Sequence, residues 1–207
     1  MRFANRSDAG RQLAGRLSTL AREDLVVLAL PRGGVPVAFE VACELGVPLD
    51  VIVVRKLGVP LRPELAMGAI GEEDVLVVND EVVRRTGVNA SHFAGVVARE
   101  REELARRVAR FRGSRTRVSL VGHTALIVDD GIATGSTALA ACRVARAQGA
   151  ERVFVAAPIG PPSAIDALRQ GADEVITLET TESFRAIGEF YDNFSPTADD
   201  EIVRLLG

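Results

Sequence analysis

Short apolar runs alternate with amphipathic segments along most of the chain. The apolar runs predict β-strands at 25–31, 50–57, 74–80, 124–130, 152–159 and 173–180. The segments between them repeat apolar residues at helical spacing and predict helices at 7–20, 35–46, 91–112, 137–148 and 162–170, with a short helix at the end of the tail. Strands and helices that alternate in this way favour an α/β fold with a mostly parallel sheet flanked by helices on both faces.

Residues 57–74 interrupt this alternation. The segment contains two prolines and three glycines, which predict a long excursion of two short antiparallel strands around a mobile tip. Arg62 and Glu64 stand near its middle.

For two of the predicted helices the sequence also predicts a detail, an N-cap in one and a solvated face in the other. Ser7 or Asp8 is the expected N-cap of the first helix, because a short polar side chain can accept from the free backbone N–H groups there. In the helix over 91–112, arginines are interleaved with glutamates that lie four residues before them, as in Glu103 and Arg107. Such pairs favour a solvated helix face over a surface for RNA or a protein partner.

The composition fits one soluble domain. Of the 207 residues, 47% are hydrophobic, 4% are aromatic and none is Trp, so an aliphatic and alanine-rich core is expected. A formal net charge of −3 disfavours a general binder of nucleic acid or anionic membranes. The first residues lack the apolar core of a signal peptide, and the run Leu25 to Leu30 is too short to cross a bilayer. A cytoplasmic protein is therefore predicted, with Cys43 and Cys142 as buried free thiols.

The stretch ALIVDDGIATGST, residues 125–137, contains the most specific chemistry in the chain. An apolar strand ends at Asp129 and Asp130, and a loop of small residues then leads into a helix. At the carboxyl end of a parallel strand, glycines, hydroxyl groups and free helix N–H groups make a site for a phosphate. Two carboxylates beside it suit sugar hydroxyls or a Mg²⁺ ion. A ribose 5-phosphate would therefore fit both the phosphate site and the carboxylate pair.

Other motifs for phosphate binding or catalysis are absent from the sequence. There is no GxxxxGK[ST], GxGxxG or GxSxG pattern. His92 and His123 have no cysteine or histidine at ligand spacing, which argues against a zinc site. A hydrolase acting on a sugar phosphate would need a positioned nucleophile, and the sequence offers none.

The stretch LIVDDGIATGST resembles the phosphoribosyl-pyrophosphate signature of the type I phosphoribosyltransferases, in which an apolar strand runs into two acids and a T-G-x-T loop. The resemblance implies a single domain over 1–207, with a core at about 20–185 and a hood from about 1–10 and 186–207. It implies that Asp129 and Asp130 hold the ribose 2- and 3-hydroxyls, directly or around Mg²⁺. The residues expected to wrap the 5-phosphate are Ala133, Thr134, Gly135, Ser136 and Thr137.

A second anion site is predicted where the first strand ends in the sequence PRGG, which resembles the pyrophosphate loop of the same family. Its glycines give the loop backbone freedom and its arginine adds positive charge. The next predicted strand also ends in two basic residues at the carboxyl edge of the sheet. The residues expected to bind pyrophosphate are Arg32, Gly33, Gly34, Arg55 and Lys56.

The implied reaction displaces pyrophosphate from C1 of the ribose by a nitrogen of a base, with Mg²⁺ as cofactor and without a covalent protein nucleophile. Negative charge builds on the leaving group, so Arg32, Lys56 and Mg²⁺ are expected to stabilise it while the two acids fix the ring. Residues 57–74 correspond to the flexible loop that closes over the family's active site and excludes water. There, Arg62 would add charge at the pyrophosphate and Glu64 would donate or accept a proton.

The sequence says less about which base accepts the phosphoribosyl group. In the hypoxanthine and guanine branch of the family, an Asp in the phosphate loop serves as a base, and this chain has Ala133 at that position. The departure argues against that branch and leaves adenine, uracil or other acceptors open. Phe3 and Arg6 belong to one part of the hood. The aromatic residues of its other part, which would stack on the base or only pin the tail to the core, are Phe190, Tyr191 and Phe194.

The competing class is a regulator that keeps the fold and binds phosphoribosyl pyrophosphate without catalysis. The retained acids, the basic pyrophosphate loop and the closing segment favour an enzyme. The family resemblance further implies a homodimer with a place in nucleotide salvage, and neither a nucleic acid nor a membrane as partner.

Overall fold

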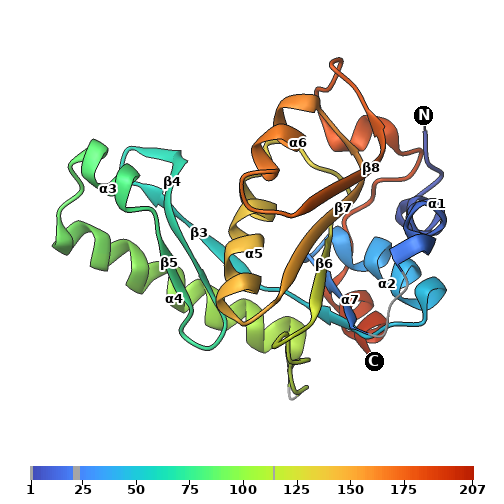
Figure 1. Cartoon of the computed structure of the whole chain (residues 1–207), viewed down its shortest axis with the longest axis horizontal. Helices are drawn as coiled ribbons and strands as arrows, with labels where there is room; N and C mark the ends of the chain where they lie inside the picture. Colours follow the sequence, from blue (N-terminus) through green and yellow to red (C-terminus); the bar gives the residue numbers. More distant parts are fainter. Residues whose placement is uncertain (1, 21–23, 114) are drawn as a thin grey trace.

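The chain folds around a five-stranded parallel sheet. The computed structural model describes residues 2–20, 24–113 and 115–207. The strands lie in the order β2-β1-β6-β7-β8, and each neighbouring pair is parallel (Figure 1). Their bounds are β1 Leu25–Ala29, β2 Leu49–Val51, β6 Thr124–Val128, β7 Arg152–Gly160 and β8 Glu174–Thr180. The predicted α/β fold is confirmed.

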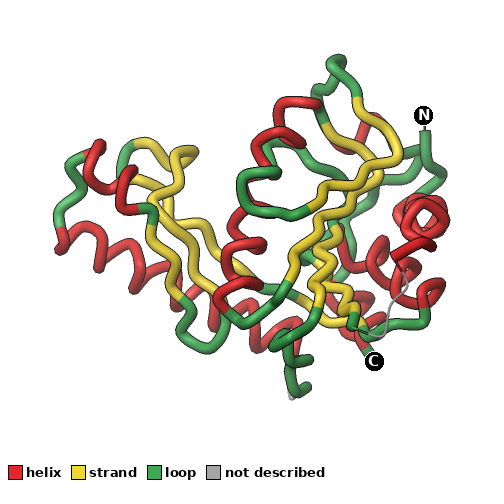
Figure 2. Tube along the Cα trace, in the orientation of Figure 1, coloured by secondary structure: helices red, strands yellow, loops and turns green. Residues whose placement is uncertain are grey.

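Helices cover both faces of this sheet, as Figure 2 shows. Along the strands, successive side chains point to opposite faces and so divide the core into two parts. Val27 and Leu126 belong to the part that α1 and α2 cover, whereas Val26 and Ile127 belong to the part beneath α5 and α6. The helix bounds are α1 Arg6–Leu17, α2 Gly34–Leu45, α5 Ser136–Ala147 and α6 Pro162–Leu168.

The first helix begins one residue earlier than predicted, and its N-cap is Asn5 rather than Ser7 or Asp8. The Asn5 side chain accepts from the backbone N–H of Asp8 at 2.9 Å. The Asp8 carboxylate in turn accepts from the backbone N–H of Ala4 at 3.0 Å. Both polar side chains therefore satisfy N–H groups near the start of the helix, and a short 3-10 helix, η1 Ser18–Leu20, follows its end.

Residues 54–112 form an arm that extends from the parallel sheet (Figure 1). It consists of an antiparallel sheet of three strands in the order β3-β4-β5, a short helix and the long helix α4. The bounds are β3 Val54–Val59, β4 Arg62–Gly71, β5 Leu76–Val78, α3 Asp80–Thr86 and α4 Ala90–Arg112. The predicted antiparallel excursion is present, but it is larger than the sequence pattern indicated.

One predicted strand and the second half of another were wrongly placed in the parallel sheet. The run 50–57 is divided, because β2 ends at Val51 and β3 begins at Val54 in the antiparallel sheet. The run 74–80 supplies β5, which pairs antiparallel with β4. An apolar run indicates that a segment is at least partly buried, but it does not say which strand will pair with it.

The two ends of the chain pair with each other. Phe3 and Tyr191 form a parallel bridge, and the backbone N–H of Phe3 donates to the carbonyl of Phe190 at 2.8 Å. The backbone N–H of Asn193 donates to the carbonyl of Ala4 at 3.0 Å. These contacts join residues 3–6 to residues 187–195 of the predicted hood, and from here on the word hood refers to these two segments. The tail elements are the 3-10 helix η2 Ile187–Phe190 and the helix α7 Asp199–Leu206.

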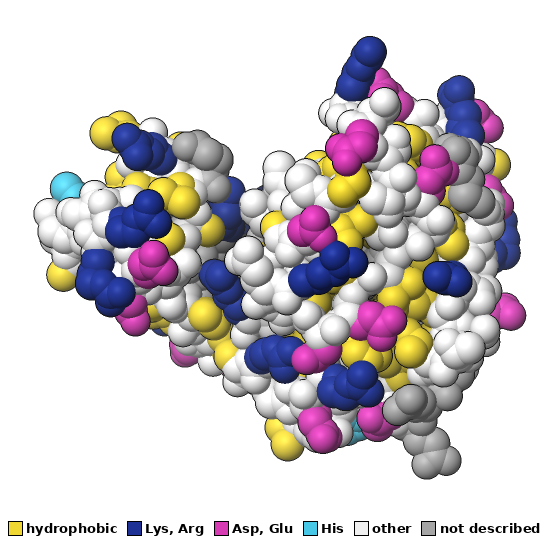
Figure 3. Space-filling view, turned by 45° about the horizontal axis from the view of Figure 1, so that its top comes forward, with side chains coloured by type: hydrophobic (Ala, Val, Ile, Leu, Met, Phe, Trp, Pro, Cys, Tyr) yellow, Lys and Arg dark blue, Asp and Glu magenta, His cyan; other side chains and the backbone are white. Residues whose placement is uncertain are grey.

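Charged side chains of both signs are interspersed over the face seen in Figure 3. On α4, Glu103 accepts from Arg106 at 2.7 Å and from Arg107 at 2.9 Å, as expected for a solvated helix face that carries ion pairs. Within the described residues, no helix is both long enough and apolar enough to cross a membrane. Cys142 is buried, which raises the pKa of its thiol to about 12, whereas Cys43 is exposed, contrary to the prediction.

Arg112, at the end of α4, joins the arm to the parallel sheet. Its guanidinium donates to both oxygens of Asp50, at 2.7 and 3.0 Å, and to both oxygens of Glu72, at 2.7 and 2.9 Å. It also donates to the carbonyl of Val51 at 2.9 Å. Buried charges are tolerated only when they are paired and hydrogen-bonded, and this group of three side chains meets both conditions.

We expect Arg112→Met to lower the free energy of unfolding by about 3–5 kcal/mol, because Asp50 and Glu72 would stay buried without their cationic partner. The matched control is Arg101→Met on the same helix, whose exposed guanidinium lies 3.8 Å from Asp74. That exposed pair should contribute less than about 1 kcal/mol. Urea denaturation measures both changes, and an equal loss in the two variants would contradict the prediction.

Candidate active site

The loops that follow β1 and β6 lie against each other at the carboxyl ends of the parallel strands. The backbone N–H of Leu30 donates to the carbonyl of Val128 at 2.9 Å, which continues the pairing of the two strands into the loops. A Cβ at Gly34 would lie 2.5 Å from the Val128 carbonyl oxygen and 2.9 Å from the Cα of Asp129. The structure therefore places the predicted pyrophosphate loop directly beside the predicted acid pair.

The two acids differ in their surroundings, which the sequence did not indicate. The Asp130 side chain is only 9% exposed and accepts from Arg6 Nε at 2.7 Å. The Asp129 side chain is only half-buried, lines the cavity of the phosphate loop, and accepts from the backbone N–H of Asp130 at 2.9 Å. Asp129 is thus the acid that faces the space where a ligand would lie.

Burial is the main influence on the protonation of both acids. It raises the pKa of the Asp129 carboxyl well above its usual range, and the neighbouring charge of Asp130 adds to the rise. Burial also raises the pKa of Asp130, while the hydrogen bond and the charge of Arg6 oppose the increase. Pairs of carboxyl groups with raised pKa values are common at functional sites.

The loop over 131–137, predicted to bind a phosphate and called the phosphate loop for that reason, lines a cavity of about 170 Å³ at the start of α5. Gly135 caps the helix with φ 72°, a left-handed conformation that favours glycine. The Thr134 hydroxyl donates to the Ser136 hydroxyl at 3.2 Å and accepts from the Ser136 backbone N–H at 3.4 Å. Ala133 and Thr137 also line the cavity, so all five predicted residues gather around one helix N-terminus that is suited to an anion.

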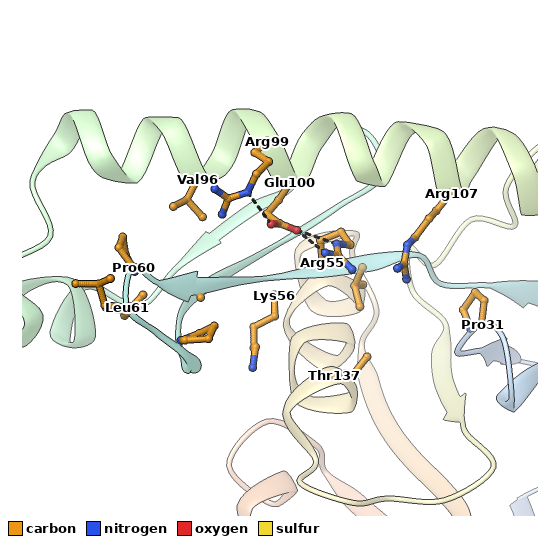
Figure 4. Close-up of a pocket in the computed structure, with 14 residues that line it drawn as sticks. Pro31, Arg55, Lys56, Pro60, Leu61, Val96, Arg99, Glu100, Arg107 and Thr137 are labelled. Atoms are coloured by element: carbon orange, nitrogen blue, oxygen red, sulfur yellow. Dashed lines mark hydrogen bonds and ion pairs between the residues drawn. The ribbon is translucent and has the colours of Figure 1, made fainter.

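A larger cleft of about 880 Å³ lies between β3, α4 and the start of α5. In Figure 4, Lys56 points to the side of β3 on which Thr137 lies, whereas Arg55 points to the opposite side, toward α4. Arg55 donates to Glu100 at 2.9 and 2.6 Å. Both residues lie in the antiparallel sheet, not at the carboxyl edge of the parallel one as predicted, and strand alternation turns them to opposite sides.

Arg32, in the predicted pyrophosphate loop, is exposed and follows a cis peptide bond to Pro31. Its Nε lies 3.4 Å from Asp199 on α7, and Asp199 also forms an ion pair with Arg110. Arg32 lines a cavity of about 360 Å³ together with three arginines of α4. One of these, Arg107, also lines the larger cleft and points from α4 toward β3 in Figure 4. It is paired with Glu103, which lines the smaller cavity as well.

The predicted aromatic residues of the hood mostly contact one another. Tyr191 is 2% exposed, and its ring centroid lies 5.4 Å from that of Phe3 and 5.1 Å from that of Phe194. Phe190 stacks on Phe184 at 5.6 Å. Since the Tyr191 ring is buried in this cluster, it pins the tail, and only Phe190 and Phe194 keep part of their surface exposed.

Arg62 and Glu64 were predicted to act from the excursion. Arg62 is exposed at the start of β4, next to Leu61, which is fully exposed at the turn with φ 67°. The side chain of Glu64 lies outside the described part of the chain. The structure therefore puts Arg62 at the turn between β3 and β4 and leaves both predicted roles as predictions.

The fold and this group of loops define the class of protein. The family model described as "Phosphoribosyl transferase domain" matches residues 4–195, so the chain belongs to the phosphoribosyltransferase family.

Relatives with high identity carry the same family name. "Putative phosphoribosyl transferase Rv0571c" of Mycobacterium tuberculosis H37Rv is 57% identical over 204 residues, which cover 99% of this chain and 46% of that protein. The counterpart MT0597 of strain CDC 1551 matches equally well. The chain thus spans about half the length of these relatives. The crystal structure of TT1426 from Thermus thermophilus is 41% identical, with a TM-score of 0.93 over 100% of this chain and 98% of that one.

We expect Gly33→Ala to destabilise the protein, because a methyl group there would overlap with the Asp130 carboxylate. Overpacking of this kind typically lowers the free energy of unfolding by about 1–3 kcal/mol. Gly15→Ala on α1 is the matched control, since a Cβ at that position meets no atom within 4 Å. Thermal unfolding compares the two variants, and an unchanged melting temperature for Gly33→Ala would show that the loop has room to move.

Proposed function

We propose that this chain transfers the 5-phosphoribosyl group from phosphoribosyl pyrophosphate to a nitrogen of a base and releases pyrophosphate. The observation that carries the proposal is the contact between three features: the phosphate loop over 131–137, the half-buried Asp129, and the Gly33–Gly34 backbone. An anion site, a hydrogen-bond acceptor for sugar hydroxyls and a second, glycine-containing loop lie side by side, as a ribose with a phosphate at one end and a pyrophosphate at the other requires.

The residues have separate tasks in the proposed reaction. The amides and hydroxyls over 133–137 bind the 5-phosphate, as expected at a helix N-terminus. Asp129 accepts from ribose hydroxyls and offsets positive charge that develops on the ring. Lys56, on the wall of the cleft, and the loop over 31–34 stabilise the departing pyrophosphate, with Arg32 released from Asp199 to take part. The base attacks C1 as the C1–O bond to pyrophosphate breaks, and the proton on the attacking nitrogen passes to solvent or to the leaving group.

The donor set suits a Mg²⁺ ion that arrives with the substrate. Among the described residues, no group of three or more His, Cys, Asp or Glu could hold a metal ion alone. Mg²⁺ is commonly bound through one or two carboxylates together with substrate phosphates, and Asp129 offers such a carboxylate. When bound, the ion would neutralise charge on the pyrophosphate.

The acceptor and the assembly are also part of the proposal. Ala133 stands where the hypoxanthine and guanine branch has an Asp, so adenine, uracil or another base is the favoured acceptor. The exposed parts of Phe190 and Phe194 would contact it. A homodimer, a cytoplasmic location and a role in nucleotide salvage are consistent with the family.

One observation favours a second candidate, a regulator that binds phosphoribosyl pyrophosphate without transferring it. Most of the aromatic surface in the hood is used in packing, and no described aromatic side chain lines the larger cleft. A base would then have little surface on which to stack.

Pyrophosphate release separates the two candidates. The protein is incubated with Mg²⁺ and phosphoribosyl pyrophosphate against a panel of purine, pyrimidine and pyridine bases. Release with one base identifies the acceptor and supports the enzyme. Tight binding of phosphoribosyl pyrophosphate with no release from any base supports the regulator.

We expect Asp129→Asn to weaken the binding of phosphoribosyl pyrophosphate by roughly tenfold or more, because hydrogen bonds to a charged acceptor contribute about 1.5–3 kcal/mol. Isothermal titration calorimetry measures the change. The control is Asp166→Asn on α6, whose carboxylate is exposed and paired with Arg169 at 2.5 Å. Wild-type affinity in Asp129→Asn would remove this residue from the site.

We expect Lys56→Met to raise the KM for phosphoribosyl pyrophosphate and to lower kcat, because the lost charge acts on the leaving group in both the bound and the transition state. Arg85→Met on α3 also removes a cationic side chain, but an exposed one in the far part of the arm, and should leave both constants unchanged. Steady-state kinetics with the identified base test this, and a change in neither constant would exclude Lys56 from the cleft chemistry.

A further inference from the structure

Arg6 makes an unusual set of contacts for a residue near a chain end. Its Nε donates to Asp130 Oδ2 at 2.7 Å, and its Nη1 donates to the carbonyl of Ser195 at 2.7 Å. The guanidinium carbon lies 3.9 Å from the centroid of the Phe194 ring. The side chain is only 12% exposed. The orientation of the guanidinium is therefore set by the fold rather than by solvent.

Asp130 is held from other directions as well. The hydroxyl of Tyr191 donates to the backbone carbonyl of Asp130 at 2.6 Å. Gly33 lies so close to the carboxylate that a side chain there would overlap with it. The residue is thus fixed by the hood on one side and by the pyrophosphate loop on the other.

The position of Asp130 affects Asp129 directly. The backbone N–H of Asp130 donates to Asp129 Oδ1 at 2.9 Å. A shift of Asp130 would therefore change the orientation of the acid that lines the phosphate-loop cavity. Through this hydrogen bond, contacts made by the hood reach the ligand-facing carboxylate.

We propose that Arg6 is a positioning residue of the active site, which fixes Asp130 and through it the orientation of Asp129. The proposal rests on the proposed binding of phosphoribosyl pyrophosphate, but not on the transfer reaction. It gives the two acids different tasks: Asp129 binds the ligand, and Asp130 connects the ligand site to the hood. The N-terminal part of the hood then acts on the donor substrate, not only on the acceptor.

The guanidinium suits this task better than an ammonium would. Its planar donors reach the Asp130 carboxylate and the Ser195 carbonyl at the same time, while its face lies on the Phe194 ring. Lysine would keep the charge but could not keep the three contacts in one geometry. The pair of variants Arg6→Met and Arg6→Lys therefore separates charge from geometry.

The main test is calorimetric titration of Mg²⁺ and phosphoribosyl pyrophosphate into the full chain, without a base. We expect Arg6→Met to weaken the affinity roughly tenfold or more and Arg6→Lys to recover part of the loss. The matched control is Arg11→Met on the same helix, where an exposed guanidinium lies 3.3 Å from Glu40, and its affinity should stay within about twofold of wild type. Wild-type affinity in Arg6→Met, or an equal loss in Arg11→Met, would overturn the proposal.

A crystal structure of ligand-free Arg6→Met provides a second test that needs no binding. We expect the Asp130 carboxylate to turn away from its place beside Gly33, the Asp130 backbone to shift with it, and the hydrogen bond from the Asp130 N–H to Asp129 Oδ1 to lengthen. Unchanged side-chain torsion angles for both acids would overturn the proposal. Should Arg6→Met fail to fold, Arg6→Lys is used in both tests and is expected to show the same changes to a smaller extent. A wild-type protein that binds phosphoribosyl pyrophosphate but releases no pyrophosphate would refute the transferase and leave the role of Arg6 standing.

Discussion

The placement of two adjacent carboxyl groups at the end of β6, one buried and one half-buried, is the constraint on which the rest of the site depends. Burial raises the pKa values of both groups, which measures how unfavourable their charged forms would be without compensation. The charge of Asp130 is compensated by the cation of Arg6, which donates to its carboxylate. Tyr191 binds the backbone carbonyl of Asp130, and Gly33 leaves the space that the carboxylate occupies. The hood and the loop over 31–34 thus both contact the acid pair.

A second buried charge group performs a similar task for the arm. Arg112 joins Asp50 of β2 to Glu72 beyond β4, so the antiparallel sheet is attached at a fixed place on the parallel one. That attachment sets β3 across from the start of α5 and brings Lys56 toward the side of Thr137 (Figure 4). The larger cleft exists because the arm supplies one of its walls.

The sequence was most informative where one local pattern determined both structure and chemistry. The run into Asp129, followed by the small-residue loop, predicted the strand, the helix start and the anion site together, because all three depend on neighbouring residues. It could not assign Arg55 and Lys56 to the antiparallel sheet, since strand pairing depends on distant partners. Nor could it separate the two acids, because the difference arises from Arg6, which lies far away in the chain and in no motif.

The contacts made by the hood also influence the temperature at which the acid pair loses its arrangement. Arg6 and Asp130 are separated by 124 positions, and Arg6 begins a helix outside the parallel sheet. Contacts of this kind can open locally at a lower cost in free energy than buried strands, and such openings do not require global unfolding. Heating should therefore disarrange the acid pair while the parallel sheet is still folded. The temperature range over which the acid pair keeps its arrangement is then set by the local opening of these contacts, and it is narrower than the range over which the fold persists.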